Sequence, residues 1–132
     1  MNTEYKKWIG TLLFCSLISL SQCDVVKYPY GQRLYQNLCA DCHMDDGSGL
    51  SSLYPSLVNE KLSSEYTLIP CFIRSGSVND DNVLKMLPMK DVSDVEITNI
   101  INYILNDMNN VHLNVGLQEV QDLLSSCHPA IQ

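Results

Sequence analysis

Basic residues are scarce in this sequence. The chain has 8 Lys and Arg against 15 Asp and Glu, which gives a formal charge of −7 at pH 7 over 132 residues. Domains that bind nucleic acid usually carry a basic surface, so this balance excludes that class of partner. A protein that docks on this chain is expected to present a basic rim. A solvated acidic surface that serves solubility is the alternative interpretation.

Internal repeats, low-complexity tracts and runs that alternate apolar with polar residues are also missing. Without strand-like alternation, the sequence predicts a nearly all-helical domain. A length of 132 residues is enough for one modest domain.

Long apolar runs are missing too. Trp8 to Leu20 is mostly apolar, but it is too short to span a bilayer comfortably, and it follows two basic residues, Lys6 and Lys7. This arrangement is typical of a secretory signal, so we expect residues 1–22 to be a signal peptide. A retained membrane helix is the alternative. Removal of residues 1–22, which include Glu4, would leave 6 basic and 14 acidic residues.

The segment Leu20-Ser21-Gln22-Cys23 resembles the bacterial lipobox, in which a cysteine is lipidated and becomes the new N-terminus. Gln22 is larger than the Gly or Ala usual at that place, and ordinary cleavage is the alternative. The resemblance implies an exported, periplasmic domain that is anchored to the membrane through Cys23, with residues 23–28 as a tether.

A second cysteine pair with metal-ligand spacing is absent, which excludes a zinc cluster. The chain does contain Cys39-Ala40-Asp41-Cys42-His43, a C-x-x-C-H motif. This motif is typical of c-type haem attachment, because its two thiols can add to the two vinyl groups along one haem edge. The sequence therefore predicts one covalent haem c on Cys39 and Cys42, with His43 as an axial ligand of the iron.

The remaining cysteines can also be placed. Cys15 lies in the expected signal peptide, which leaves Cys71 and Cys127 in the exported domain. Because exported compartments are oxidising, we expect these two residues to form a disulfide that ties the C-terminal segment to the middle of the domain. Two buried free thiols are the alternative.

The helix pattern follows from apolar spacing and capping residues. We expect a helix from near Pro29 into the motif, and a short or kinked helix over residues 64–74 with Ser64 as its N-cap and Pro70 inside it. Residues 76–87 are expected to form a loop. A capping box at Ser93 and Glu96 predicts a helix with an apolar stripe. Residues 106–116 are an expected connector, and residues 117–127 an amphipathic helix.

The second axial ligand is expected to be a methionine, since the two other histidines, His112 and His128, are expected at the surface. Met44 is too close to His43 to cross the ring, and Met108 is expected to face away from the apolar stripe. Met86 and Met89 lie in one loop before the capped helix, and spacing alone does not choose between them.

Together these features resemble class I cytochromes c, the single-haem, all-helical family. The resemblance implies about four helices around one haem within residues 29–132, with the last helix as an extra element. It implies that Gly31 and Tyr35 pack against Tyr103 where two helices cross, and that the Pro55 carbonyl accepts a hydrogen bond from His43 Nδ1–H. Compared with short bacterial members, the spacing to Val92 favours Met86 as the ligand, with Met89 as the alternative.

Two further residues are candidates for haem contacts. Arg74 is expected either to pair with a haem propionate or to be simply exposed, and Tyr54 is expected to line the pocket or contact a propionate.

The resemblance implies a one-electron carrier rather than an enzyme, since protein ligands fill both axial positions of the iron. Its expected partners are redox proteins: a terminal oxidase, a quinol-oxidising complex or a periplasmic reductase. No small-molecule substrate is expected. The alternatives are a sensor or peroxidase-like protein with an open sixth site, and a haem-bearing subunit of a larger complex.

Overall fold

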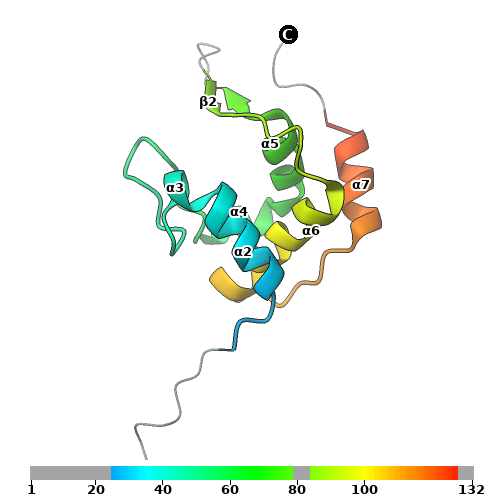
Figure 1. Cartoon of the computed structure of the whole chain (residues 1–132), viewed down its shortest axis with the longest axis horizontal. Helices are drawn as coiled ribbons and strands as arrows, with labels where there is room; N and C mark the ends of the chain where they lie inside the picture. Colours follow the sequence, from blue (N-terminus) through cyan, green and yellow to red (C-terminus); the bar gives the residue numbers. More distant parts are fainter. Residues whose placement is uncertain (1–24, 79–83, 128–132) are drawn as a thin grey trace, which may run out of the picture.

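The computed structural model describes residues 25–78 and 84–127 (Figure 1). The expected signal peptide, the lipidation site Cys23 and His128 lie outside these residues. In the described part of the chain, no helix is long and apolar enough to cross a membrane. Helices dominate the fold, which confirms the predicted class, and the described residues also contain a small two-stranded sheet.

The elements are α2 (Pro29–Leu38), α3 (Ala40–His43), α4 (Glu60–Ser64), a 3₁₀ turn (Tyr66–Leu68), α5 (Ile69–Ser75), β1 (Ser77–Val78), β2 (Leu84–Met86), α6 (Asp94–Asn102), a π-helix (Tyr103–Met108) that continues α6, and α7 (Leu117–Ser125). In Figure 1, α3 and α7 lie on opposite sides of the molecule, with α6 between them.

Helix α6 forms the centre of the core. Its predicted capping box is present: the Ser93 hydroxyl accepts from the Glu96 N–H at 3.3 Å, and the Glu96 carboxylate accepts from the Ser93 N–H at 2.8 Å. Ile97, Ile100 and Ile101 are fully buried. The apolar stripe read from the sequence therefore faces the interior.

Helix α2 crosses α6 at Gly31. A Cβ atom added to this glycine would overlap the Asn99 carbonyl oxygen and lie 2.8 Å from Tyr103 Cβ, so the backbones are in direct contact. One turn further along α2, the Tyr35 ring packs against the Tyr103 ring with a centroid distance of 5.5 Å. The two helices can approach this closely only because residue 31 has no side chain.

Polar side chains near the end of the π-helix hold two other segments. The Asp107 carboxylate accepts the backbone N–H groups of Lys27 and Tyr28 at 2.7 and 2.9 Å, just before α2 begins. Asn109 Nδ2 donates to the Leu57 carbonyl at 2.8 Å, and its Oδ1 accepts the Asn59 N–H at 2.9 Å. These bonds fix the entry to α2 and the exit from the loop after the C-x-x-C-H motif.

Two buried asparagines hold the connector to α7. Asn102 exchanges two hydrogen bonds with the backbone of Val115, at 2.8 and 2.9 Å, and Asn106 donates to the Leu113 carbonyl at 2.7 Å. The side-chain amides replace the backbone partners that an extended segment lacks. This pairing directs the chain into α7.

The prediction for residues 64–74 was wrong in detail. Ser64 ends α4, which is capped instead by the Asn59 side chain, and α5 begins at Ile69. Pro70 therefore lies in the first turn of a new helix, where its missing N–H has no intrahelical partner to lose. Two short helices joined by a 3₁₀ turn replace the single short or kinked helix that was expected.

The expected loop 76–87 contains an antiparallel pair in which Ser77 faces Met86 and Val78 faces Leu84. Strands of two and three residues are too short to show an alternating pattern, so no sequence signal marks them. The pairing places Met86 at the end of β2.

Candidate functional site

The C-x-x-C-H motif lies at the junction of α2 and α3. The Cys39 N–H closes the last turn of α2 on the Tyr35 carbonyl at 2.8 Å, and α3 then carries Cys42 and His43. Among the described residues, Cys39 and Cys42 are the free thiols; Cys39 is buried and Cys42 half-buried. Burial raises the pKa of Cys39 to about 11, so this thiol is protonated at neutral pH.

A tight loop orients His43. The Gly49 N–H donates to the His43 carbonyl at 3.0 Å, and His43 Nδ1 lies 2.9 Å from the Pro55 carbonyl oxygen. A carbonyl only accepts, so Nδ1 must carry the proton, and Nε2 is left with its lone pair. Gly49 has φ +72°, and a Cβ there would lie 2.5 Å from the Tyr54 carbonyl oxygen, so the loop requires glycine.

Two tyrosines flank the motif. The Tyr35 hydroxyl donates to the Met44 carbonyl at 2.7 Å, and burial raises the pKa of this hydroxyl above its usual range, so it remains a donor. The Tyr54 ring stands edge-on to the His43 ring at a centroid distance of 6.4 Å. A hydrogen bond with Cys42 raises the pKa of Tyr54. Met44 has φ +66°, which turns the chain sharply away from the motif.

The two candidate methionine ligands lie on one segment. Both Met86 and Met89 are half-buried and pack against the core. The Met89 N–H donates to the Ile73 carbonyl at 2.9 Å, which joins this segment to α5. Met108 is also half-buried, with its Cε 2.5 Å from where a Gly47 Cβ would lie, so it fills space behind the loop after the motif.

Arg74 makes contacts that the sequence did not reveal. Its Nη1 donates to the Lys90 carbonyl at 2.8 Å, and its Nη2 forms an ion pair with Asp94 at 2.7 Å. Each terminal nitrogen of the guanidinium thus has one protein acceptor. The pairing of Arg74 with a haem propionate stays a prediction, since the remaining N–H groups can still donate. No local pattern links an arginine to a carboxylate 20 residues away.

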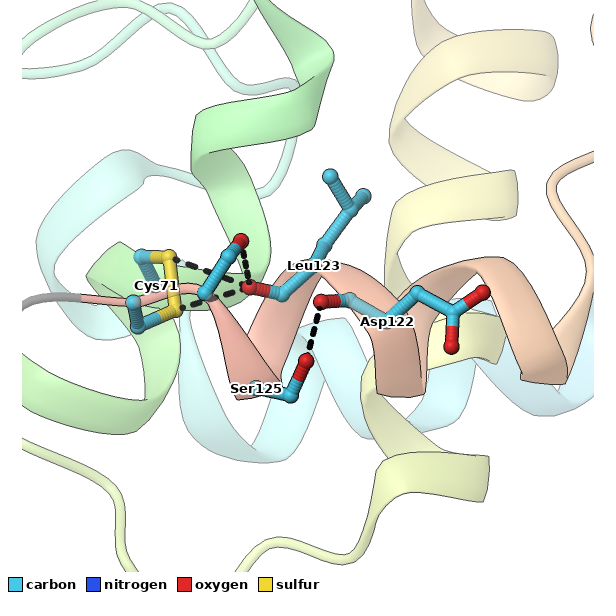
Figure 2. Close-up of a disulfide and its surroundings, with 6 residues drawn as sticks. Cys71, Asp122, Leu123 and Ser125 are labelled. Atoms are coloured by element: carbon cyan, nitrogen blue, oxygen red, sulfur yellow. Dashed lines mark hydrogen bonds between the residues drawn. A yellow bond between two sulfur atoms is a disulfide. The ribbon is translucent and has the colours of Figure 1, made fainter.

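A disulfide joins Cys71 of α5 to Cys127, just after α7 (Figure 2). The Cα atoms are 5.5 Å apart and the loop between them spans 56 residues. Both sulfurs lie near the Leu123 carbonyl oxygen, at 3.9 and 3.4 Å, and that oxygen accepts the Ser126 hydroxyl at 2.7 Å. The bridge fastens the last helix to α5.

A surface hollow of about 600 Å³ lies between α4 and the end of the π-helix. Val58, Asn59, Met108 and Asn109 are among its lining residues, whereas the cysteines of the motif, His43 and Met86 are not. The hollow is therefore separate from the residues that are predicted to bind haem.

The residues present fit a covalently attached haem. Two residues separate the two free thiols, and the adjacent imidazole is held with Nε2 available. Within residues 25–78 and 84–127, no group of three or more His, Cys, Asp or Glu could hold a metal ion, so the thiols have no partners for a zinc cluster. This donor set, in a helical fold built on the Gly31 crossing, defines a mono-haem c-type cytochrome domain.

Comparison with known proteins agrees with that class. Residues 27–104 match the family described as "Cytochrome C oxidase, cbb3-type, subunit III", and the chain belongs to this family. It is also 26% identical over 114 residues to the fructose dehydrogenase cytochrome subunit of Gluconobacter japonicus. That alignment covers 78% of this chain and 24% of the relative, so the chain spans about a quarter of the relative's length. Haem c is accordingly the cofactor of this domain.

Proposed function

We propose that this protein is a one-electron carrier whose haem is attached through Cys39 and Cys42 and ligated by His43 and Met86. The observation that carries the proposal is the bond between His43 Nδ1 and the Pro55 carbonyl, which fixes the imidazole tautomer with Nε2 free to bind iron. An iron that is held on both faces supplies a one-electron couple and leaves no position for a substrate.

The chain's own residues perform three tasks in this proposal. Cys39 and Cys42 hold the cofactor, the Gly49–Pro55 turn orients the imidazole, and the segment from Met86 to Met89 supplies a thioether on the other side. A thioether favours the ferrous state and raises the reduction potential relative to a second imidazole. Half-buried Met86 and Met89 also pack on the apolar core, which keeps water away from that side.

The ligand assignment is tested with two matched variants. Met86→Ala is expected to give high-spin ferric iron that has lost the weak far-red band of methionine ligation and that binds added imidazole. Met89→Ala is expected to keep the band, because Met89 serves as a packing residue. The opposite pair of results would transfer the assignment to Met89.

The carrier function is tested on the purified wild-type holoprotein. Its pyridine-haem spectrum should show a c-type haem, the ferric form should show the far-red band, and the ferrous form should not bind carbon monoxide. Rapid carbon monoxide binding at neutral pH would instead support a sensor or peroxidase-like protein with an open sixth site.

We further propose that the partners are redox proteins of the exported compartment: a terminal oxidase, a quinol-oxidising complex or a periplasmic reductase. The relative named as the cytochrome subunit of a dehydrogenase supports a role beside a larger complex. Co-purification after mild detergent extraction separates a stable subunit from a free carrier. Transient association, with a small interface, is expected for a carrier.

The proposed location is the periplasmic face of a membrane, with Cys23 as the lipidated residue. Cys23→Ser is expected to move the haem protein from the membrane fraction to the soluble fraction. Wild-type protein that is already soluble after cell lysis would contradict the anchor and leave the electron-carrier proposal untouched.

A further inference from the structure

The segment from Met86 to Lys90 runs along the C-terminal end of α5. It is bound to α5 through the Met89 N–H, which donates to the Ile73 carbonyl at 2.9 Å. At its start, the Met86 carbonyl oxygen lies so close to Gly76 that a Cβ added there would overlap it. Gly76 also has φ +73°, a conformation that residues with a side chain rarely adopt.

A single side chain holds the end of the segment. Arg74, also on α5, donates from Nη1 to the Lys90 carbonyl at 2.8 Å and from Nη2 to Asp94 at 2.7 Å. Asp94 is the first residue of α6 and has a side chain 37% exposed, against 29% for Arg74. The guanidinium therefore joins three elements: α5, the methionine segment and the start of α6.

This arrangement explains why a partly exposed ion pair matters here. Exposed pairs contribute little to stability by themselves. The contact of Arg74 with Lys90 is different, because it is a charge-assisted hydrogen bond to a backbone carbonyl. The ion pair with Asp94 keeps the guanidinium turned toward that carbonyl. Loss of either partner would free the end of the segment while α5 and α6 remain packed.

We propose that Arg74, oriented by Asp94, is a positioning residue that holds the methionine segment against the iron. The inference rests on the proposed function, since it requires Met86 or Met89 to be the axial ligand, and it holds for either one. A ligand bond of this kind is in equilibrium with an open form in which the methionine has moved away. The contacts of Arg74 stabilise the bound form and thereby lower the population of the open one.

The test is an imidazole titration of the ferric holoprotein. An external ligand binds only the open form, so its apparent affinity is proportional to the open population. Arg74→Gln is expected to raise the apparent imidazole affinity about tenfold, the effect expected for one hydrogen bond to a charged group. The far-red band should weaken, while haem content and far-ultraviolet circular dichroism stay at wild-type values.

Arg33→Gln is the matched control, because it makes the same change of charge. Arg33 is exposed on α2, where its guanidinium lies over the Tyr30 ring at 5.6 Å from the centroid. This variant should bind imidazole as the wild type does. Equal affinities in Arg74→Gln, Arg33→Gln and the wild type would overturn the positioning role.

Two milder variants keep the proposal testable if Arg74→Gln does not fold. Arg74→Lys keeps the charge, but a single ammonium cannot copy the two-ended contact, so its affinity should fall between those of the wild type and Arg74→Gln. Asp94→Asn leaves the bond to Lys90 but weakens its orientation, and a smaller rise is expected. Wild-type affinity in both would reject the inference.

The wild-type spectrum distinguishes failure of the two proposals. If the ferric wild type has no far-red band and binds imidazole as an open haem does, the methionine ligation itself is wrong. If the wild type has the band and the Arg74 variants match it, the ligation stands and the role of Arg74 is rejected.

Discussion

The two sides of the proposed haem site are held together in different ways. On the histidine side, the contacts that orient His43 and Met44 join residues 6 to 12 positions apart: Gly49 to His43, Tyr35 to Met44, and His43 to Pro55. On the methionine side, the contacts of α5 span 16 residues to Lys90, 20 to Asp94 and 56 across the disulfide. One side is built locally, and the other depends on the packing of the whole domain.

This difference separates attachment of the cofactor from its ligation. Changes on the histidine side should determine whether haem is present at all. Changes on the methionine side should leave the haem attached and alter stability or the sixth ligand.

The largest expected effect comes from the thiols. Cys39→Ala with Cys42→Ala removes both attachment points, so the exported protein should carry no covalent haem. The measurement is the pyridine-haem spectrum together with the intact mass. Cys71→Ala with Cys127→Ala is the matched pair on the methionine side and should keep one covalent haem. Equal haem contents in the two double variants would contradict the proposed difference between the histidine side and the methionine side.

The second effect is the loss of the disulfide. Cys71→Ser with Cys127→Ser releases a loop of 56 residues, and the free energy of unfolding should fall by about 4 kcal/mol. Guanidinium unfolding of the oxidised holoprotein and its double variant measures the difference. An unchanged unfolding midpoint would show that the non-covalent contacts of α7 suffice to hold it on α5.

The third effect concerns the crossing of α2 and α6, which is tested by replacing Gly31 and, as a control, Gly116. Gly31→Ala places a methyl group against the Asn99 carbonyl and Tyr103 Cβ, and should cost about 1–3 kcal/mol of unfolding free energy. Gly116→Ala is the control, since a Cβ there meets nothing within 4 Å. It should cost less than about 1 kcal/mol, through a weaker helix cap. Equal costs would argue against close contact of α2 and α6.

The smallest expected effect is a dependence of the unfolding free energy on pH, to which Asp46 and Glu96 each contribute. Bonds from the Ser48 side chain and backbone lower the pKa of Asp46 near the motif, and bonds from Ser93 lower that of Glu96 at the cap of α6. Because both folded-state pKa values are lowered, the stability they contribute is present above the unfolded values of 3.8 and 4.5. It is lost as the pH falls through the folded values.

Asp46→Asn and Glu96→Gln should each flatten the acid limb of a plot of stability against pH, measured by thermal unfolding between neutral and acid pH. Above the unfolded pKa values, each variant should be slightly less stable than the wild type. A variant whose acid limb keeps the wild-type slope would show that its carboxyl does not contribute.

The same contrast explains what the sequence could and could not predict. The C-x-x-C-H motif, the capping box of α6 and the apolar stripe are local patterns, and they correctly indicated the class of protein and the central helix. The prediction of Ser64 as an N-cap is wrong, because Asn59, five residues earlier, is an equally good capping residue and the sequence offers no way to rank the two. The Arg74 contacts depend on how α5 meets α6, which no short window contains.

The short turn from His43 to Pro55 has a consequence for the order of assembly. Closing the twelve-residue loop between His43 and Pro55 costs less chain entropy than closing the 56-residue loop of the disulfide, so we expect the imidazole to be oriented before the last helix is fastened. The methionine segment, by contrast, is bound to α5, which the bridge to Cys127 fastens near the end of the described chain. If Cys39, Cys42 and His43 hold the haem as proposed, these residues would reach their final arrangement before the methionine segment does.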